Sequence, residues 1–339
     1  MKEALLYEKL EGGKTRCGVC RRRCVIAPGG LGFCRTRRNE GGRLYTLIYG
    51  LVAGLHADPV EKKPLYHFFP GSLCTSLGTL GCSFRCPGCQ NWELSRAAPD
   101  ELGGGTEELS PEELIRSAAR YKCRGVAWTY NEPSIWLEYT LDGAKLAKKK
   151  GLYTVYVTNG FMTPEALELM APHLDAFRVD IKGFSEETYQ RIAGVRALAG
   201  VLDSARLAKC AHRMHVECVT NVTPTINDDE GELKGMARWI RSELGPDTPW
   251  HVTAFSPHQE LSDLPSTPAA QLERVRQFGL DAGLRYVYIG NVPGHQAGNT
   301  WCHKCGALLI RREGYDTSLV GLKGAACARC ATPLAGRFV

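Results

Sequence analysis

Residues 75–92 read TSLGTLGCSFRCPGCQNW, a short β-rich run followed at once by a loop that contains Cys82, Cys86 and Cys89. Three thiolates on one loop, at spacings of four and three residues, can reach three corners of a cubane cluster and leave the fourth iron without a protein ligand. An open iron is a site for a substrate or a cofactor. A zinc knuckle with a distant fourth ligand and a plain ferredoxin-type cluster are the structural alternatives, but neither explains why three cysteines follow the end of a strand. Three further residues permit a tight loop here: Gly81, Pro87 and Gly88.

Outward from this loop, short β-rich runs alternate with stretches of helical period. The runs are Thr75–Leu80, Val126–Tyr130, Tyr153–Thr158, Phe177–Ile181, Met214–Val219, His251–Phe255 and a last one, Tyr286–Ile289. Alternating β and α units of this length predict a parallel sheet with right-handed crossovers. Six or seven units predict the α/β class and a partial (β/α)6 TIM-like barrel, in which chemistry gathers at the C-terminal ends of the strands.

Two helices are expected to begin at defined capping sequences. Ser110-Pro111-Glu112-Glu113 combines a cap, a proline in the first turn and early acids, and Thr163-Pro164-Glu165 opens in the same way. Both signals lie between predicted strands, as the alternation requires.

Composition bounds the class of protein. The chain has 339 residues, of which 44% are hydrophobic and 23% charged, so it is an ordinary globular chain. A net charge of +6 tolerates an anionic partner without demanding one. No stretch approaches the ~20 apolar residues of a membrane helix, and Met1–Lys14 has no secretory apolar region. We expect a cytoplasmic protein with no membrane partner.

Fifteen cysteines are many for such a chain. In a reducing compartment, clustered cysteines indicate metal more often than disulfides. The four that lie outside clusters are interpreted as small buried hydrophobic residues: Cys74, Cys123, Cys210 and Cys218.

Two clusters flank the predicted barrel. The sequence therefore predicts three parts, an N-terminal metal module (1–66), the barrel (67–298) and a zinc-ribbon-like tail (299–339). The tail carries two Cys-x-x-Cys pairs, whose four thiolates suit structural zinc: Cys302, Cys305, Cys327 and Cys330. The N-terminal four fit zinc and a second [4Fe–4S] cluster: Cys17, Cys20, Cys24 and Cys34. Arginines surround the N-terminal group, either as an anion-binding face or as a solvated basic surface: Arg16, Arg21, Arg22, Arg23, Arg35, Arg37 and Arg38.

The Cys-x3-Cys-x2-Cys loop resembles the hallmark of the radical S-adenosylmethionine (SAM) superfamily. The resemblance implies that SAM binds the open iron and that one electron breaks a sulfur–carbon bond. The resulting 5′-deoxyadenosyl radical then abstracts hydrogen from a substrate. The chain departs from the family at Gly88, where most members have an aromatic residue that packs on the adenine.

Residues at the ends of later strands resemble the family's SAM-binding elements. Tyr130-Asn131-Glu132-Pro133 is similar to the Gly-Gly-Glu-Pro element, with Tyr-Asn in place of Gly-Gly. Glu132 is therefore expected to accept hydrogen bonds from the SAM ammonium; a helix-capping turn is the alternative. Thr158-Asn159-Gly160-Phe161 is similar to an element of glycyl-radical activases, although Val157 replaces their cation-binding Asp; a simple turn is the alternative.

Two elements of the later strands complete the predicted SAM contacts. Asp180 and Lys182 share one face of their strand and match an Asp-x-Lys element that faces SAM in similar enzymes; an exposed ion pair is the alternative. His258 lies in a segment that resembles the one near the adenine in activases. Three other polar residues near strand ends are each expected to be satisfied core or rim groups: Glu217, Asn221 and His251.

A closer resemblance covers nearly the whole chain to Gly298. The N-terminal block, the stretch Asp58–Phe68 and the stretch Ile289–Val292 are similar to the AmmeMemoRadiSam system radical SAM enzyme, a relative of pyruvate formate-lyase activating enzymes. That family implies a Memo-like protein and an AMMECR1-domain protein as partners. A reductase, flavodoxin or ferredoxin is the implied electron donor.

The leading hypothesis is therefore an enzyme that makes a 5′-deoxyadenosyl radical and acts on an unidentified substrate. The activase likeness favours a glycyl radical on a partner protein. A basic face and a zinc ribbon favour modification of RNA or a nucleobase. The rival from another class is a non-catalytic scaffold that binds zinc or a cluster and does not turn over SAM.

Overall fold

Each predicted strand of the alternation is present, with ends shifted by at most three residues. The computed structural model describes residues 1–99 and 105–338. The chain forms two compact units. Unit 1 comprises Met1–Asp58, Leu73–Phe177 and Ala199–Met214, and unit 2 comprises Pro59–Ser72, Arg178–Leu198 and His215–Val339. The three parts predicted from the sequence have other boundaries than these two units, and that division stays a prediction.

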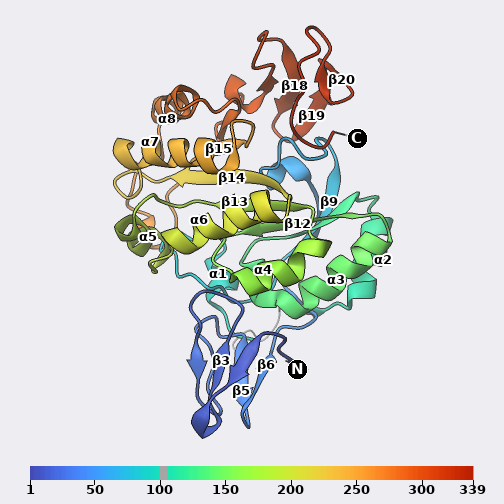
Figure 1. The fold of residues 1–339 in the computed structure, drawn as a ribbon, viewed down its shortest axis with the longest axis vertical. Coiled ribbons are helices and arrows are strands. Elements are labelled where there is room, and N and C mark those ends of the chain that lie inside the picture. Colours follow the sequence, from blue (N-terminus) through green and yellow to red (C-terminus); the bar gives the residue numbers. More distant parts are fainter. Residues whose placement is uncertain (100–104, 339) are drawn as a thin grey trace. The chain divides into compact units, whose positions relative to one another are not determined.

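Unit 1 contains the first half of the parallel sheet (Figure 1). Its hydrogen-bonded strand order is β8 (Leu55–Pro59), β9 (Leu73–Leu77), β11 (Gly125–Trp128), β12 (Tyr153–Thr158) and the start of β13 (Ala176–Asp180). Strands β9, β11 and β12 run parallel. All residues of β11 and β12 are buried, as expected for strands covered on both faces.

The helices of unit 1 are α1 (Trp92–Arg96), α2 (Pro111–Arg120), α3 (Leu137–Lys149), α4 (Pro164–Met170) and α6 (Leu198–Arg206). Of these, α2 packs on β9, and α3 packs on β11 and β12. Both predicted helix starts are confirmed. Ser110 and Glu113 form a reciprocal capping box at α2, and the Thr163 hydroxyl accepts a hydrogen bond from the amide of Ala166 at α4.

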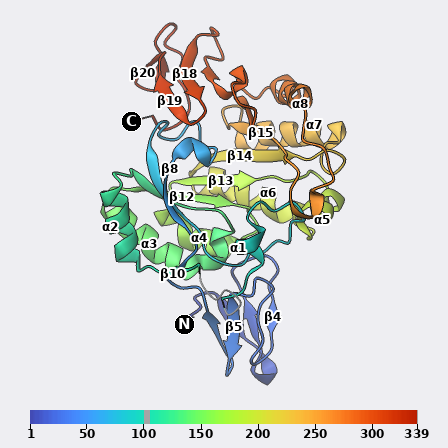
Figure 2. The same ribbon diagram turned by 180° about the vertical axis from the view of Figure 1, so that it is seen from behind.

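The N-terminal segment of unit 1 folds as small antiparallel sheets (Figure 2). One contains β1 (Lys2–Glu3), β6 (Arg43–Thr46) and β5 (Arg37–Glu40); another contains β2 (Tyr7–Lys9), β3 (Thr15–Cys17) and β4 (Val25–Ile26); a third pairs β7 (Leu51–Val52) with β10 (Glu107–Glu108). Of the N-terminal cysteines, Cys17 ends β3, and Cys20, Cys24 and Cys34 lie between the strands β3, β4 and β5.

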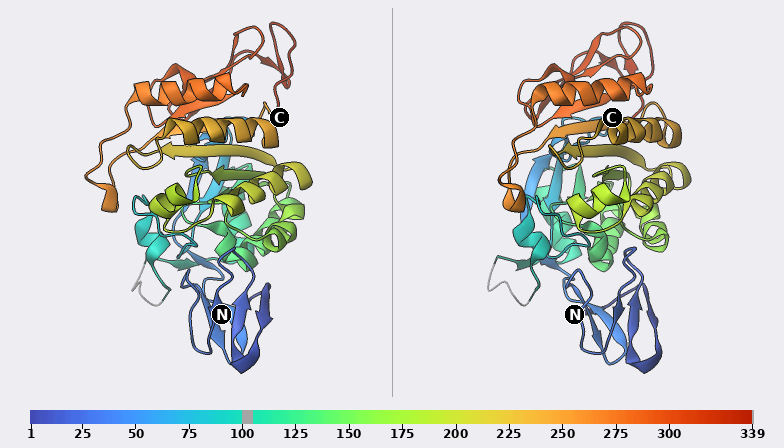
Figure 3. Two further views of the ribbon diagram at one scale, coloured as in Figure 1. Left: turned by 60° about the vertical axis from the view of Figure 1, so that its left-hand side comes forward. Right: turned by 90° about the vertical axis from the view of Figure 1, so that its left-hand side faces the viewer.

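Unit 2 contains the second half of the alternation. The end of β13 is followed in the sheet by β14 (His215–Val222), β15 (Trp250–Ala254) and β16 (Val287–Gly290), and the last three are parallel. The helices of this unit are α5 (Glu186–Ala193), α7 (Glu230–Trp239) and α8 (Ala269–Asp281). Figure 3 shows α7 and α8, in gold and orange, side by side.

The C-terminal segment of unit 2 forms two small antiparallel sheets. They are β17 (Thr300–Trp301), β18 (Leu308–Glu313) and β19 (Asp316–Leu319), and β20 (Leu322–Lys323) with β21 (Ala326–Cys327). Their core packs Cys302 and Cys327 with Tyr286, Tyr288 and Phe338.

The predicted α/β class with a mostly parallel central sheet is confirmed. Among residues 1–99 and 105–338, every helix is too short or too polar to cross a membrane.

Candidate active site

The three cysteines of the predicted cluster lie on the loop after β9, in unit 1. Cys82, Cys86 and Cys89 are each partly exposed. The Cys82 sulfur accepts a hydrogen bond from the amide of Phe84 at 3.4 Å. Burial, together with the nearby carboxylate of Glu132, raises the pKa of the Cys82 thiol. A metal bound by this sulfur must therefore displace a proton.

Asn131 ties this loop to the end of β11. Its side-chain oxygen accepts from the amide of Thr79 at 3.2 Å, and its side-chain nitrogen donates to the carbonyl of Gly81 at 2.8 Å. Gly81 has a φ of +79°, and a Cβ there would lie 2.4 Å from the carbonyl oxygen of Cys34. Only glycine fits such a position, so the start of the cysteine loop is fixed from two sides.

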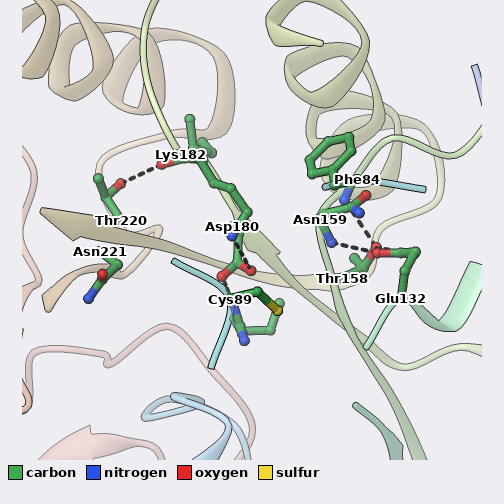
Figure 4. A network of polar contacts seen from close by, with 12 residues as sticks. Phe84, Cys89, Glu132, Thr158, Asn159, Asp180, Lys182, Thr220 and Asn221 are labelled. Atoms are coloured by element: carbon green, nitrogen blue, oxygen red, sulfur yellow. Dashed lines mark hydrogen bonds and ion pairs between the residues drawn. The ribbon is translucent and has the colours of Figure 1, made fainter. Parts of the chain in front are cut away.

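Glu132 joins the ends of β11 and β12 through its carboxylate (Figure 4). Oε1 accepts from the Ser134 amide at 2.9 Å and the Thr158 hydroxyl at 2.8 Å, and Oε2 accepts from the Asn159 amide at 2.8 Å. The carboxylate is buried, and burial raises its pKa despite these donors. The capping interpretation is thus realised, because Glu132 caps the short 3-10 helix Pro133–Trp136.

Asn159 connects the end of β12 to the cysteine loop. Its side-chain nitrogen lies 3.0 Å from the Ser83 hydroxyl and 3.8 Å from the Cys82 sulfur. Its side-chain oxygen accepts from the amide of Phe161 at 3.0 Å. Asn159 therefore orients a donor toward the first thiol of the loop.

Asp180 and Lys182 lie at the end of β13, in unit 2. The Lys182 ammonium is 3.3 Å from the Asp180 carboxylate, and Arg178 forms a second ion pair with the same group. Burial acts to raise the pKa of Asp180, but the charges of Arg178 and Lys182 outweigh it, so the pKa is lowered. The predicted shared face of Asp180 and Lys182 is confirmed. Figure 4 shows both, with Asn221 on the neighbouring strand β14.

His258 follows β15 and is half-buried. Its Nε2 is shielded from solvent and has no hydrogen-bond partner among the described residues. The residues expected to be satisfied core or rim groups have partners. Glu217 accepts hydrogen bonds from His215, His251 and two backbone amides, and Asn221 donates to Thr253 and Ala254.

The structure thus groups Asn131, Glu132, Thr158 and Asn159 around the cysteine loop within unit 1. Reasoning from the sequence missed two residues of this group. Ser83 bonds to Asn159, and Arg22 donates from Nε to the Ser83 carbonyl at 2.7 Å. It also missed Arg178 in unit 2, although the same alternation that pairs Asp180 with Lys182 puts Arg178 on that face.

The two flanking cysteine groups differ in geometry. The sulfurs of Cys302, Cys305, Cys327 and Cys330 all lie within 4.8 Å of one another, and no other group of three or more such ligand atoms is this tight in residues 1–99 and 105–338.

One prediction about the scattered cysteines is wrong. Cys74, Cys123 and Cys218 are buried, but Cys210 is exposed. It lies on the π-helical turn Leu207–Ala211 that follows α6, and only Ala208 of this turn is buried.

Comparison with known proteins identifies the family. A family model described as the Radical SAM superfamily matches residues 77–240, a range that includes the cysteine loop and the ends of β11, β12 and β13. Residues 77–240 form a Radical SAM domain. Members are enzymes that use a [4Fe–4S] cluster and SAM, and this radical SAM enzyme keeps all three cysteines of the hallmark loop.

Relatives extend the comparison beyond the matched domain. An uncharacterised Methanocaldococcus jannaschii protein is 42% identical over 95% of both chains, so the two form one family. The pyruvate formate-lyase-activating enzyme of Clostridium pasteurianum is 26% identical over 54% of this radical SAM chain and 77% of its own. The crystal structure of Streptococcus suis SuiB has a TM-score of 0.50 at 11% identity, over 69% of this chain and 52% of that chain, and supports the fold alone.

Proposed function

We propose that the chain cleaves SAM reductively at a [4Fe–4S] cluster bound by Cys82, Cys86 and Cys89. The observation that carries the proposal is a loop of three thiols at the C-terminal end of the first parallel strand, inside the matched Radical SAM region. The donor set fits an open cluster better than a zinc knuckle. Among the described residues, these sulfurs belong to no ligand group as tight as the C-terminal one, so they are not gathered around a single small ion.

When bound, the cluster supplies the electron that splits SAM into methionine and a 5′-deoxyadenosyl radical, which takes hydrogen from the substrate. The chain's own residues hold the loop for this task. Asn131 fixes its start, and Asn159 donates toward the Cys82 sulfur, where an N–H···S contact stabilises thiolate charge. Glu132 holds Thr158 and Asn159 in place. We assign Asn131, Glu132, Thr158 and Asn159 to the SAM-binding side of the loop.

The residues of unit 2 remain predicted SAM contacts. Asp180 and Lys182 form a charged pair at a strand end, which suits the carboxylate and ammonium groups of SAM. The Nε2 of His258 has no hydrogen-bond partner within residues 1–99 and 105–338, which suits a hydrogen bond to the adenine.

The test is formation of 5′-deoxyadenosine. The protein is purified without oxygen, reconstituted with iron and sulfide, and mixed with SAM and dithionite. We expect product from the native chain and from Cys210→Ala, whose cysteine is exposed and unclustered, and none from Cys86→Ala. A native protein that binds no iron and gives no spectroscopic response to SAM would overturn the proposal in favour of the zinc scaffold.

We infer that the substrate is a glycine residue of a partner protein. Two observations favour this over RNA or a nucleobase: the similarity to activating enzymes over most of their length, and the Thr158-Asn159-Gly160-Phe161 element that resembles theirs. The family resemblance separately implies Memo-like and AMMECR1-domain proteins as partners, and a flavodoxin, ferredoxin or reductase as electron donor. A glycine-centred EPR signal on the partner supports the inference, and a mass shift confined to digested RNA contradicts it.

We also propose that the C-terminal group binds zinc. The sulfur–sulfur distances are 3.6 Å for Cys302–Cys330 and 3.7 Å for Cys305–Cys327. Four sulfurs at the usual Zn–S distance of about 2.3 Å in a tetrahedron stand about 3.8 Å apart. The group therefore already has the dimensions of a structural zinc site.

A further inference from the structure

The four N-terminal cysteines surround one hollow in unit 1. Cys17, Cys20, Cys24 and Cys34 all line it, and three of them are buried. Its other walls are mainly apolar, and its polar wall residues besides the cysteines are Arg22, Arg37 and Ser83. Four thiols that converge on one sheltered space form a built ligand set, not scattered core residues.

The spacing of these sulfurs does not suit a single ion. No three of them lie within 4.8 Å of one another, whereas all four C-terminal sulfurs do. Sulfurs that share one zinc ion stand about 3.8 Å apart. Sulfurs that each bind a different iron of a cubane must stand farther apart, because the cluster core lies between them. Within one chain, the two four-cysteine groups therefore differ in spacing, and of the two only the C-terminal group is as tight as a single-ion site.

The walls of the hollow offer buried donors without partners, although the Arg37 guanidinium also pairs with the Glu138 carboxylate at 2.8 Å. Arg37 is 1% exposed, and its Nε has no hydrogen-bond partner among the described residues; the same holds for Nη2 of Arg22. A buried donor without a partner is costly. Sulfide and thiolate sulfurs of an anionic cluster would accept these N–H groups, and such hydrogen bonds tune cluster potentials.

The hollow adjoins the Cys82 loop. Ser83 belongs to both, and Arg22 donates to its carbonyl at 2.7 Å. The carbonyl of Cys34 lies so close to Gly81 that no side chain fits there. The guanidinium groups of Arg22 and Arg85 lie 3.4 and 4.5 Å from the Phe33 ring.

Two arginines bond across from one cysteine segment to the other. Arg22, which lies between Cys20 and Cys24 in sequence, donates to the Ser83 carbonyl, and Arg85 of the Cys82 loop donates to the Phe33 carbonyl at 2.8 Å and the Cys82 carbonyl at 3.0 Å. Cationic side chains that join the two segments suit two neighbouring anionic centres.

We propose that Cys17, Cys20, Cys24 and Cys34 bind a second [4Fe–4S] cluster that passes electrons to the centre on the Cys82 loop. A one-electron donor of the flavodoxin or ferredoxin class reduces the N-terminal cluster from the 2+ to the 1+ state. The N-terminal cluster returns to 2+ as it reduces the neighbouring cluster by one electron. No bond or proton changes. The electron-transfer part rests on the proposed function, and the metal assignment does not.

Metal analysis of a variant without the catalytic cluster tests the assignment. The variant Cys82→Ala/Cys86→Ala/Cys89→Ala, reconstituted without oxygen, should retain about four irons and four sulfides per chain. After dithionite reduction it should show a [4Fe–4S] EPR signal that SAM does not alter. Adding Cys24→Ala should remove the iron, and adding Cys210→Ala should not. Hydrogen exchange in β12, which should stay as slow as in the native chain, reports that unit 1 of each variant is folded.

A triple variant with no iron and two zinc ions per chain would overturn the assignment. Failure of the proposed function looks different, because the native chain would then give no 5′-deoxyadenosine while this iron count remained.

Electron transfer is tested with two donors. With reduced flavodoxin, Cys24→Ala should form 5′-deoxyadenosine at least tenfold more slowly than Cys210→Ala. With dithionite, which is small enough to reduce the Cys82-loop cluster directly, the difference between the two variants should be much smaller than with flavodoxin. Equal rates with flavodoxin would overturn the relay and leave the cluster assignment to the metal analysis.

Discussion

Glu132 shows how a single buried carboxylate organises the candidate site. It accepts four hydrogen bonds from three donors: the Ser134 amide, the Thr158 hydroxyl and the Asn159 amide. An ionised carboxylate is acceptor-only and suits such surroundings. A glutamine amide, which carries N–H donors of its own, does not suit these surroundings.

Glu132→Gln is therefore expected to destabilise the protein by about 1–3 kcal/mol, since an amide N–H would face donors in a buried site. The free energy of unfolding in urea measures the loss. Glu168→Gln on the exposed face of α4 is the matched control and should stay within about 0.5 kcal/mol of the native chain. A Glu132→Gln protein as stable as this control would show that the carboxylate does not organise the strand ends.

His67 makes unit 2 sensitive to acid. It is buried, with one ring nitrogen 2.6 Å from the Tyr288 hydroxyl and the other 2.7 Å from the Ala335 carbonyl. Burial lowers the pKa of His67 to about 4. Because the unfolded chain takes up the proton near pH 6.5 and the folded chain only near pH 4, stability falls as the pH decreases through this window.

We expect a loss of about 2 kcal/mol from His67 alone between pH 7.5 and pH 5. Urea unfolding at the two pH values should show this difference in the native chain and a smaller one in His67→Gln. His56 is exposed, and His56→Gln should keep the native pH dependence. Identical pH dependence in His67→Gln and the native chain would contradict the prediction.

At the scale of elements, two helix caps of the same predicted type differ in what else they contact. The Ser110 cap of α2 is confined to its own box with Glu113. The Thr163 hydroxyl at α4 is buried and also donates to the carbonyl of Gly18 at 2.7 Å. The Ser110 cap contacts its own helix, whereas the Thr163 cap also links α4 to the turn at Gly18.

Ser110→Ala should cost about 1 kcal/mol, the usual value of a lost N-cap. Thr163→Ala should cost about 2 kcal/mol or more, because it also leaves the Gly18 carbonyl without this donor. The two free energies of unfolding are compared in one urea series. Equal losses would mean that the second bond of Thr163 contributes nothing.

Much of the secondary structure was predictable from local sequence. The strands follow from buried β-rich runs, the helix starts from capping residues, and the pair Asp180 and Lys182 from the period of two. Contacts between distant segments were not predictable in this way. Arg22 reaches Ser83 across 61 positions, and Asn159 reaches Ser83 across 76. No local pattern encodes such contacts, because they depend on which turns meet after folding.

At the scale of the whole molecule, the C-terminal cysteine group belongs to unit 2, and the other two cysteine groups belong to unit 1. The C-terminal sulfurs are part of a hydrophobic core with Leu309, Ile310 and Leu334. With the proposed zinc bound, metal binding and core packing would form one cooperative event in that segment.

Zinc removal should loosen this segment selectively. With a strong chelator, the amides of β18 should exchange with deuterium at least tenfold faster, while those of β12 keep their protection. Hydrogen exchange followed by mass spectrometry measures both strands in one sample. Cys302→Ser/Cys305→Ser should reproduce the effect without chelator. Unchanged exchange in β18 would show that the ribbon folds without its metal.

The contact of His67 with Ala335 has a consequence for synthesis of the chain. The partners are 268 residues apart, and the backbone of Arg337 also pairs with His67 and Phe69. At roughly 5–20 residues per second, a ribosome needs on the order of half a minute to cover that interval. All segments of unit 1 have emerged well before then. Its cysteines are thus available to the cell's metal-delivery machinery while Phe68 still lacks its final neighbours, and a nascent chain stalled in this interval should be bound by chaperones at the Tyr66–Phe69 segment.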